Sequence, residues 1–155
     1  MRLLAEQHDR ISLFGRLHDA PFSTAGLLRE VMGIASRRSP RPGQAGRVAR
    51  IERLIQAKAW TEAALALIEL ELPQWQLRRI AYDGGEWHCA LSRQRELPDW
   101  LDQSSGASHL DLALAIPCAL VATKDVTDSP DGPSVPSAPR KFKPGYVPLF
   151  CDNFA

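Results

Sequence analysis

The spacing of apolar residues predicts helices in the first part of the chain. Residues 1–20 place apolar side chains near helical intervals and are followed by a break at Pro21. Ser23 or Thr24 is expected to cap a second short helix. Helices this short need a partner surface to be stable. We therefore expect residues 1–35 to form a helical N-terminal arm that is loosely attached.

A stronger helical pattern begins at Arg47, where apolar residues recur at i, i+3 and i+4. We expect two helices that join near residues 58–61, with Thr61 as the cap of the second, and one continuous helix is the alternative. The segment 63–72 is apolar almost all round, and Pro73 ends it. A helix of this composition is buried on more than one side.

Two segments with strand character follow, residues 75–82 and 86–92, on either side of Asp83-Gly84-Gly85. Glycine supplies the positive φ of a tight hairpin turn, at Asp83-Gly84 or at Gly84-Gly85. The apolar face of this hairpin is expected to pack on helices, and it comprises Ile80, Tyr82, Trp87, Cys89 and Leu91. The opposite face then comprises Arg79, Glu86, His88 and Ser92.

The last apolar segment predicts one more helix, from His109 to about Ala122, with Ser108 as its cap. Pro117 lies inside this pattern and predicts a kink or an early end. Prolines are frequent between residues 123 and 155, among serines, aspartates and lysines. Such a composition cannot form a core, and we expect a largely disordered tail.

Together these elements predict a small α+β fold with a helical pair, a two-stranded antiparallel β-hairpin and a covering C-terminal helix. A length of 155 residues suits one domain with a tail. The expected organisation is an N-terminal helical arm at 1–35, a basic linker at 36–46, a core domain at 47–122 and a proline-rich tail at 123–155.

Charge is distributed unevenly along the chain although the formal net charge is only +1. Residues 29–53 are rich in arginine, and residues 59–120 carry an excess of carboxylates. This order favours a basic segment that folds back onto an acidic core. The alternative is nucleic-acid or anion binding, for which aromatic platforms and known binding motifs are lacking. The arginines that would make such contacts are Arg37, Arg38, Arg41, Arg47 and Arg50.

The chain has three cysteines and no CxxC pair, which argues against a disulfide framework and favours reduced thiols in a cytoplasm. Charged residues interrupt the N-terminus too early for a secretory signal. The longest uncharged apolar run, residues 112–122, is too short to span a bilayer. We therefore expect a cytoplasmic protein with no membrane association.

Candidate catalytic and metal-binding residues are few. His88 and Cys89 are adjacent on a predicted strand, so their side chains point to opposite faces and cannot easily serve one reacting atom. A small enzyme that uses Cys89 or His88 is therefore only an alternative. No histidine pair has zinc-site spacing, and no phosphate-binding glycine motif occurs. We expect neither a metal nor a cofactor.

Tryptophans at the edges of elements suggest a surface for a protein partner. Trp75 and Trp100 both lie close to prolines, and tryptophans that are partly buried at edges are common in interfaces. The outward residues of the hairpin, Arg79, Glu86 and His88, complete the predicted partner surface. The favoured function is a non-enzymatic interaction or regulatory module, and nucleic acid is a less favoured partner.

Three runs of sequence stand out in the second half of the chain: AWTEAALALIELELPQWQLRRIAYDGGEWHCALSRQ, LPDWLD and ASHLDLALAI. Through these runs, residues 47–118 resemble a group of short uncharacterised bacterial proteins. The resemblance implies no activity, cofactor or site.

Overall fold

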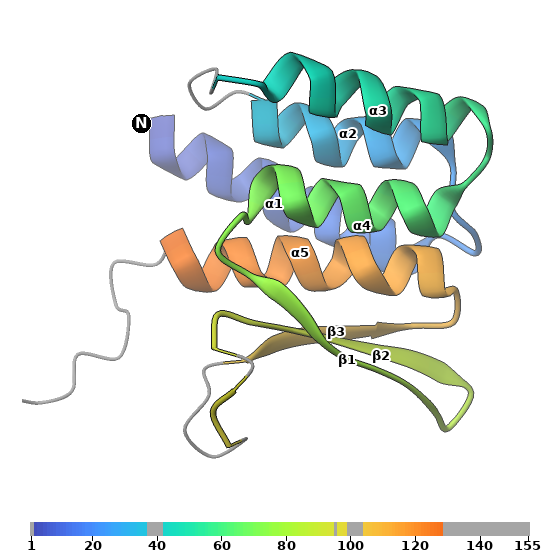
Figure 1. Cartoon of the computed structure of the whole chain (residues 1–155). Helices are drawn as coiled ribbons and strands as arrows, with labels where there is room; N and C mark the ends of the chain where they lie inside the picture. The colour runs from blue at the N-terminus through green and yellow to red at the C-terminus, as the bar shows by residue number, and fades with distance from the viewer. Residues whose placement is uncertain (1, 37–41, 95, 99–103, 129–155) are drawn as a thin grey trace, which may run out of the picture.

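The computed structural model describes residues 2–36, 42–94, 96–98 and 104–128. Within these residues the chain forms five helices and a three-stranded antiparallel sheet (Figure 1), which confirms the predicted α+β class. The elements, in chain order, are α1 (Arg2–Asp19), α2 (Ala25–Ser36), α3 (Gln44–Gln56), α4 (Trp60–Glu71), β1 (Gln76–Asp83), β2 (Glu86–Ser92), β3 (Ser105–His109) and α5 (Leu112–Asp128).

The predicted hairpin is present as β1 and β2. Asp83 pairs with Glu86, and Gly84 and Gly85 have φ of 60° and 91°, so the turn is the two-residue Gly84-Gly85 turn. The prediction of only two strands was wrong, because β3 pairs with the other side of β2. The spatial order is therefore β1-β2-β3, with β2 in the centre.

The third strand replaces the predicted start of the last helix. Ser108 lies in β3 and is not a cap; α5 is capped instead by Asp111, whose Oδ1 accepts the Ala113 N–H at 2.9 Å. Gly106 permits the close approach of β3 to β2, because a Cβ at this position would lie 2.7 Å from the Cys89 carbonyl oxygen. Strand pairing thus overrides the helical pattern that begins at His109.

Helix α5 lies between the sheet and the other helices (Figure 1). It packs against β3 and β2 on one side and against α4 and α1 on the other. Every residue from Ala113 to Val121 is buried, as expected for a helix that is apolar all round. The predicted covering helix is therefore the central helix of the domain.

Helix α5 does not end early at Pro117 but continues to Asp128. Two threonines in its last part donate their hydroxyls to helix carbonyls, Thr123 to Ala119 at 2.7 Å and Thr127 to Thr123 at 2.9 Å. Lys124 also forms an ion pair with the buried carboxylate of Glu71 in α4. The expected boundary of the core domain at residue 122 is therefore too early.

The N-terminal helices belong to the same core. Leu13 and Leu17 of α1, and Leu28 and Val31 of α2, are at most 2% exposed. Thr24 caps α2 as predicted, because its Oγ1 accepts the Leu27 N–H at 3.3 Å. The prediction of a loosely attached arm was wrong, since α5 and α4 supply the partner surface that these helices need.

The structure has two separate helices, α3 and α4, as predicted, and the alternative of one continuous helix was wrong. Lys58 follows α3 with φ of 57°, a left-handed conformation. Its N–H donates to the Ile55 carbonyl at 3.0 Å, and the Ala59 N–H donates to the Leu54 carbonyl at 2.9 Å. These bonds form a Schellman motif. Thr61 is not the cap of α4, because the helix already begins at Trp60.

Candidate functional site

One face of the sheet is open while the other is covered. Figure 1 shows the described helices on a single side of the sheet, the side on which α5 packs. Small residues form the floor of a hollow of about 490 Å³ on the opposite side, the outer face. These floor residues are Ala81 on β1, Ala90 on β2 and Gly106 on β3. Their lack of long side chains brings the surface close to the backbone of all three strands.

Charged and polar side chains border this hollow. Arg79, Asp83 and His88 are exposed. The Ser108 hydroxyl donates to Glu86 Oε2 at 2.7 Å, which links β3 to the start of β2. The border therefore presents both positive and negative groups, and its arrangement depends on the register of the three strands.

The structure brings together three of the five residues of the predicted partner surface: Arg79, Glu86 and His88. Trp75 is not part of an exposed surface, because it is only 8% exposed and the Arg93 guanidinium lies 5.2 Å from its ring centre. Trp100 lies outside the described residues.

Sequence reasoning missed the contribution of β3 to the hollow. Gly106 and Ser108 give no strong strand signal, and Ser108 was predicted to cap the last helix. An isolated glycine can also mark a close approach between strands, which is its role here. That signal becomes useful only once the neighbouring strand is known.

The predicted apolar face of the hairpin is only partly buried. Cys89 and Leu91 lie in the core, as expected, but Ile80 is 38% exposed and Tyr82 62% exposed. Helix α5 packs over β2 and β3, so these β1 side chains lie beyond the helical layer. The Tyr82 ring contacts the Trp87 ring, with centroids 5.0 Å apart. Residues that lie on the same face of the hairpin are therefore not all buried to the same extent.

Ion pairs partly neutralise the basic segment, one with the acidic part of the fold and one within the segment itself. Arg50 in α3 lies 3.7 Å from Glu69 in α4, and Arg29 in α2 lies 3.0 Å from Glu52 in α3. Glu52 raises the pKa of the Arg29 guanidinium through its hydrogen bonds and its charge. Arg47 is exposed on α3. The other candidate anion contacts lie outside the described residues: Arg37, Arg38 and Arg41.

The cysteines of the described core are protected rather than reactive. Cys89 and Cys118 are both free and buried. Burial raises the pKa of Cys89 to about 11; burial and the neighbouring Cys89 thiol raise the pKa of Cys118 to about 12. Both thiols are thus protonated near neutral pH, whereas a cysteine nucleophile reacts as the thiolate. His88 is exposed on the opposite face from Cys89.

His109 has a structural environment. It is 3% exposed, its Nδ1 accepts the Asp111 N–H at 2.9 Å, and its Nε2 lies 3.1 Å from the His18 carbonyl oxygen. Because the backbone N–H can only donate, Nδ1 is unprotonated and Nε2 carries the proton. Asp111 also accepts the Ser23 N–H at 2.9 Å. This cluster fastens the α1–α2 loop to the start of α5.

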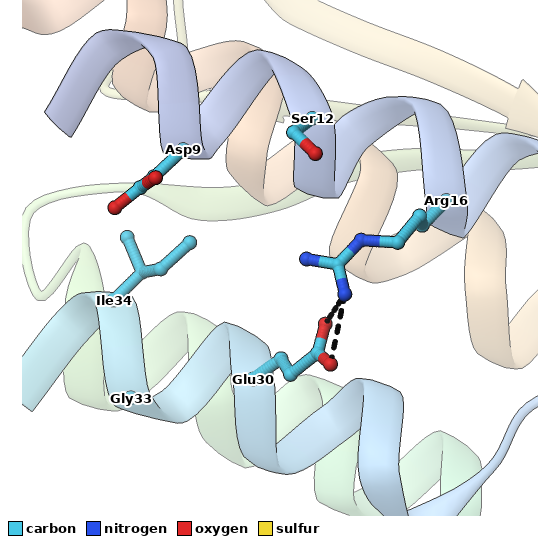
Figure 2. Close-up of a pocket in the computed structure, with 6 residues that line it drawn as sticks. All are labelled: Asp9, Ser12, Arg16, Glu30, Gly33 and Ile34. Atoms are coloured by element: carbon cyan, nitrogen blue, oxygen red, sulfur yellow. Dashed lines mark hydrogen bonds and ion pairs between the residues drawn. The ribbon is translucent and has the colours of Figure 1, made fainter. Parts of the chain in front are cut away.

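A second hollow of about 330 Å³ lies between α1 and α2 (Figure 2). Arg16 and Glu30 form an ion pair across it, with their closest atoms 2.7 Å apart. Both side chains are about half exposed, so the pair adds at most about 1 kcal/mol to stability. Arg16 and Glu30 compensate each other's charge, and Asp9 is the third charged residue in the lining. The outer face of the sheet is the stronger candidate site.

Within the described ranges, no cluster of histidine, cysteine or carboxylate side chains could hold a metal ion. None of the described helices combines the length and apolarity needed to cross a bilayer. The resemblance of residues 47–118 to short bacterial proteins stays a prediction. Comparisons with models of protein families, with curated proteins and with solved structures find no match for this chain.

Proposed function

We propose that the protein is a non-enzymatic interaction module that binds a protein partner on the outer face of its sheet. The observation that carries this proposal is the hollow over Ala81, Ala90 and Gly106 on the face opposite α5. A sheet face with small residues lets a partner side chain reach close to the strands. Surrounding polar groups would then fix its orientation.

The border of the hollow favours a polypeptide over a nucleic acid. Arg79 and His88 can donate hydrogen bonds, while Asp83 can accept them. Glu86 lies next to the border, where it accepts the hydroxyl of the lining residue Ser108. A polyanion would meet these two carboxylates as well as the arginine. A protein segment with charges of both signs matches the border better, because complementary charges select the partner and its register.

Blocking the hollow tests this proposal. The variant Ala90→Arg places a long charged side chain on the floor, whereas Ala45→Arg makes the same change at an exposed position of α3. Immobilised wild-type protein and both variants are exposed to a native lysate of the source organism, and bound proteins are identified by mass spectrometry. A purified candidate is then titrated against all three by calorimetry.

A specific partner should bind wild type and Ala45→Arg alike and lose at least about tenfold in affinity for Ala90→Arg. Circular dichroism confirms that the variants are folded. Equal binding by all three proteins, or retention of no partner by wild type, would refute the proposed role of this face.

A further inference from the structure

Strand β1 forms an open edge of the described sheet. It pairs with β2 on one side, and no described strand pairs with its other side. An uncovered edge presents N–H and C=O groups that can pair with another strand. The side chains of Ile80 and Tyr82 are exposed beside this edge. Backbone and apolar groups are thus available together.

The register of the hairpin determines which β1 residues face the open edge. Asp83 and Glu86 flank a two-residue turn, so they form a hydrogen-bonded pair. The N–H and C=O of Asp83 therefore point to β2, and by alternation those of Ala81 do so too. The backbone groups of Ile80 and Tyr82 consequently point to the open edge.

The sequence of β1 is complementary to itself in one antiparallel register. When two β1 strands pair about Ala81, Ile80 lies opposite Tyr82 of the second copy, and each pair uses backbone groups that face the edge. On the outer face, Arg79 lies opposite Asp83 of the second copy. The two-fold axis makes each of these pairs occur twice.

Neighbouring registers lack this match. A shift that centres the pairing on Arg79 places two arginines opposite each other, and a shift that centres it on Asp83 places two aspartates opposite each other. Like charges in directly opposed positions are destabilising, whereas opposite charges and pairs of aromatic and β-branched residues are favourable. Registers centred on Ile80 or on Tyr82 place Ala81 opposite Arg79 or opposite Asp83 and so lack the opposite-charge pairs. Of these five registers, the one centred on Ala81 is the one that places Arg79 opposite Asp83, and the side chains therefore favour it.

We propose that two copies of the chain associate through antiparallel pairing of their β1 strands about Ala81. The result is one continuous six-stranded sheet, three strands from each copy. This contact uses the edge of the sheet and is a different interaction from partner binding, although Arg79, Ala81 and Asp83 also line the hollow on the outer face. A single strand pair buries less than a standard interface, so we expect a dissociation constant in the micromolar range.

A charge exchange tests the register. Sedimentation equilibrium of the full chain, from about 1 µM to about 1 mM, should give a monomer–dimer equilibrium. Arg79→Asp replaces two attractive pairs by two repulsive pairs and should weaken the dimer about tenfold or more. The double variant Arg79→Asp/Asp83→Arg restores opposite charges in the same register and should recover the wild-type constant. Arg47→Asp, on exposed α3, is the control for net charge.

Cross-linking tests the axis directly. Opposed residues in a non-hydrogen-bonded antiparallel pair have Cα atoms about 4.5 Å apart, which lies within the range of a disulfide. In a Cys151→Ser background, Ala81→Cys should therefore form a disulfide-linked dimer on mild oxidation. His88→Cys provides an exposed thiol on the central strand and should cross-link far less.

These outcomes decide the proposal. A dimer that weakens with Arg79→Asp, recovers in the double variant and cross-links at Ala81→Cys supports it. A chain that is monomeric at all concentrations overturns it, as does a dimer that the charge exchange leaves unchanged. Because Ala90→Arg leaves β1 intact, failure of this edge contact is distinguishable from failure of the proposed partner site.

Discussion

The left-handed residue between α3 and α4 should be a removable source of strain. Lys58 has φ of 57°, which the Schellman motif at the end of α3 requires. For a residue with a Cβ, the left-handed helical conformation costs about 1–2 kcal/mol. We therefore predict that Lys58→Gly increases the free energy of unfolding.

The expected gain follows from two opposing effects. Removing the Cβ relieves about 1–2 kcal/mol in the folded state. Glycine also gives the unfolded chain more conformational freedom, which takes back about 0.4–1 kcal/mol. The net stabilisation should be about 0.5–1 kcal/mol, or a rise in Tm of about 1–4 °C for a chain of this size. Lys58 is exposed, so little packing is lost.

Urea denaturation followed by circular dichroism measures this effect, with thermal unfolding as a second assay. Lys58→Ala is the matched control, because it removes the long side chain but keeps the Cβ. Ala57→Gly introduces glycine at the preceding right-handed residue, where φ is −75°, and should destabilise the protein. If Lys58→Gly is no more stable than Lys58→Ala, strain at this residue does not limit stability.

Three further predictions concern the buried polar groups and thiols. Unfolded thiols lose their protons near pH 9.0, whereas Cys89 and Cys118 keep theirs until about pH 11 and 12. The folded state therefore binds more protons than the unfolded state above pH 9. Urea titrations should show that the free energy of unfolding falls as the pH rises, by up to about 1.4 kcal/mol per pH unit for each thiol. If a Cys89→Ala/Cys118→Ala variant shows the same fall, the thiols are not its cause. Lys124→Met should lower the free energy of unfolding by about 3 kcal/mol, because it leaves the Glu71 carboxylate buried and unpaired. A second substitution, Glu71→Leu, should recover most of this loss. Chemical denaturation of the single and double variants checks both expectations, and additive losses would argue against a coupled pair. His109→Ala removes a buried ring and leaves the partly buried Asp111 N–H and the His18 carbonyl oxygen without this partner. It should cost about 2 kcal/mol in the same assay, whereas a loss below about 0.5 kcal/mol would show that water replaces the ring.

Local sequence signals predicted the helices and the hairpin. The pair Gly84-Gly85 identifies the turn in the sequence, and both glycines have a positive φ in the structure. Pro73 follows the end of α4 as expected. These features depend on residues that are close in sequence. The α+β class could be predicted for the same reason, since the change from helical to alternating periodicity is local.

Features that depend on distant residues could not be predicted. The strand at Ser105–His109 exists because β2 offers it an edge, and Trp75 is buried because Arg93 and the core surround it. The exposure of Tyr82 depends on where α5 lies. For the candidate site, alternation correctly placed Arg79, while the hollow itself required the third strand.

The first and last described helices are fastened to each other along their length. Arg10 of α1 forms an ion pair with Asp125 of α5 at 3.4 Å, and the cluster of His18, His109 and Asp111 joins the other ends of these helices. The surface of α1 that packs against α5 thus becomes buried only after α5 has left the ribosome. During synthesis the nascent chain must hold an incomplete core with exposed apolar surface, the condition in which chains aggregate or recruit chaperones. Synthesis rate and chaperone supply should therefore affect the yield of folded protein.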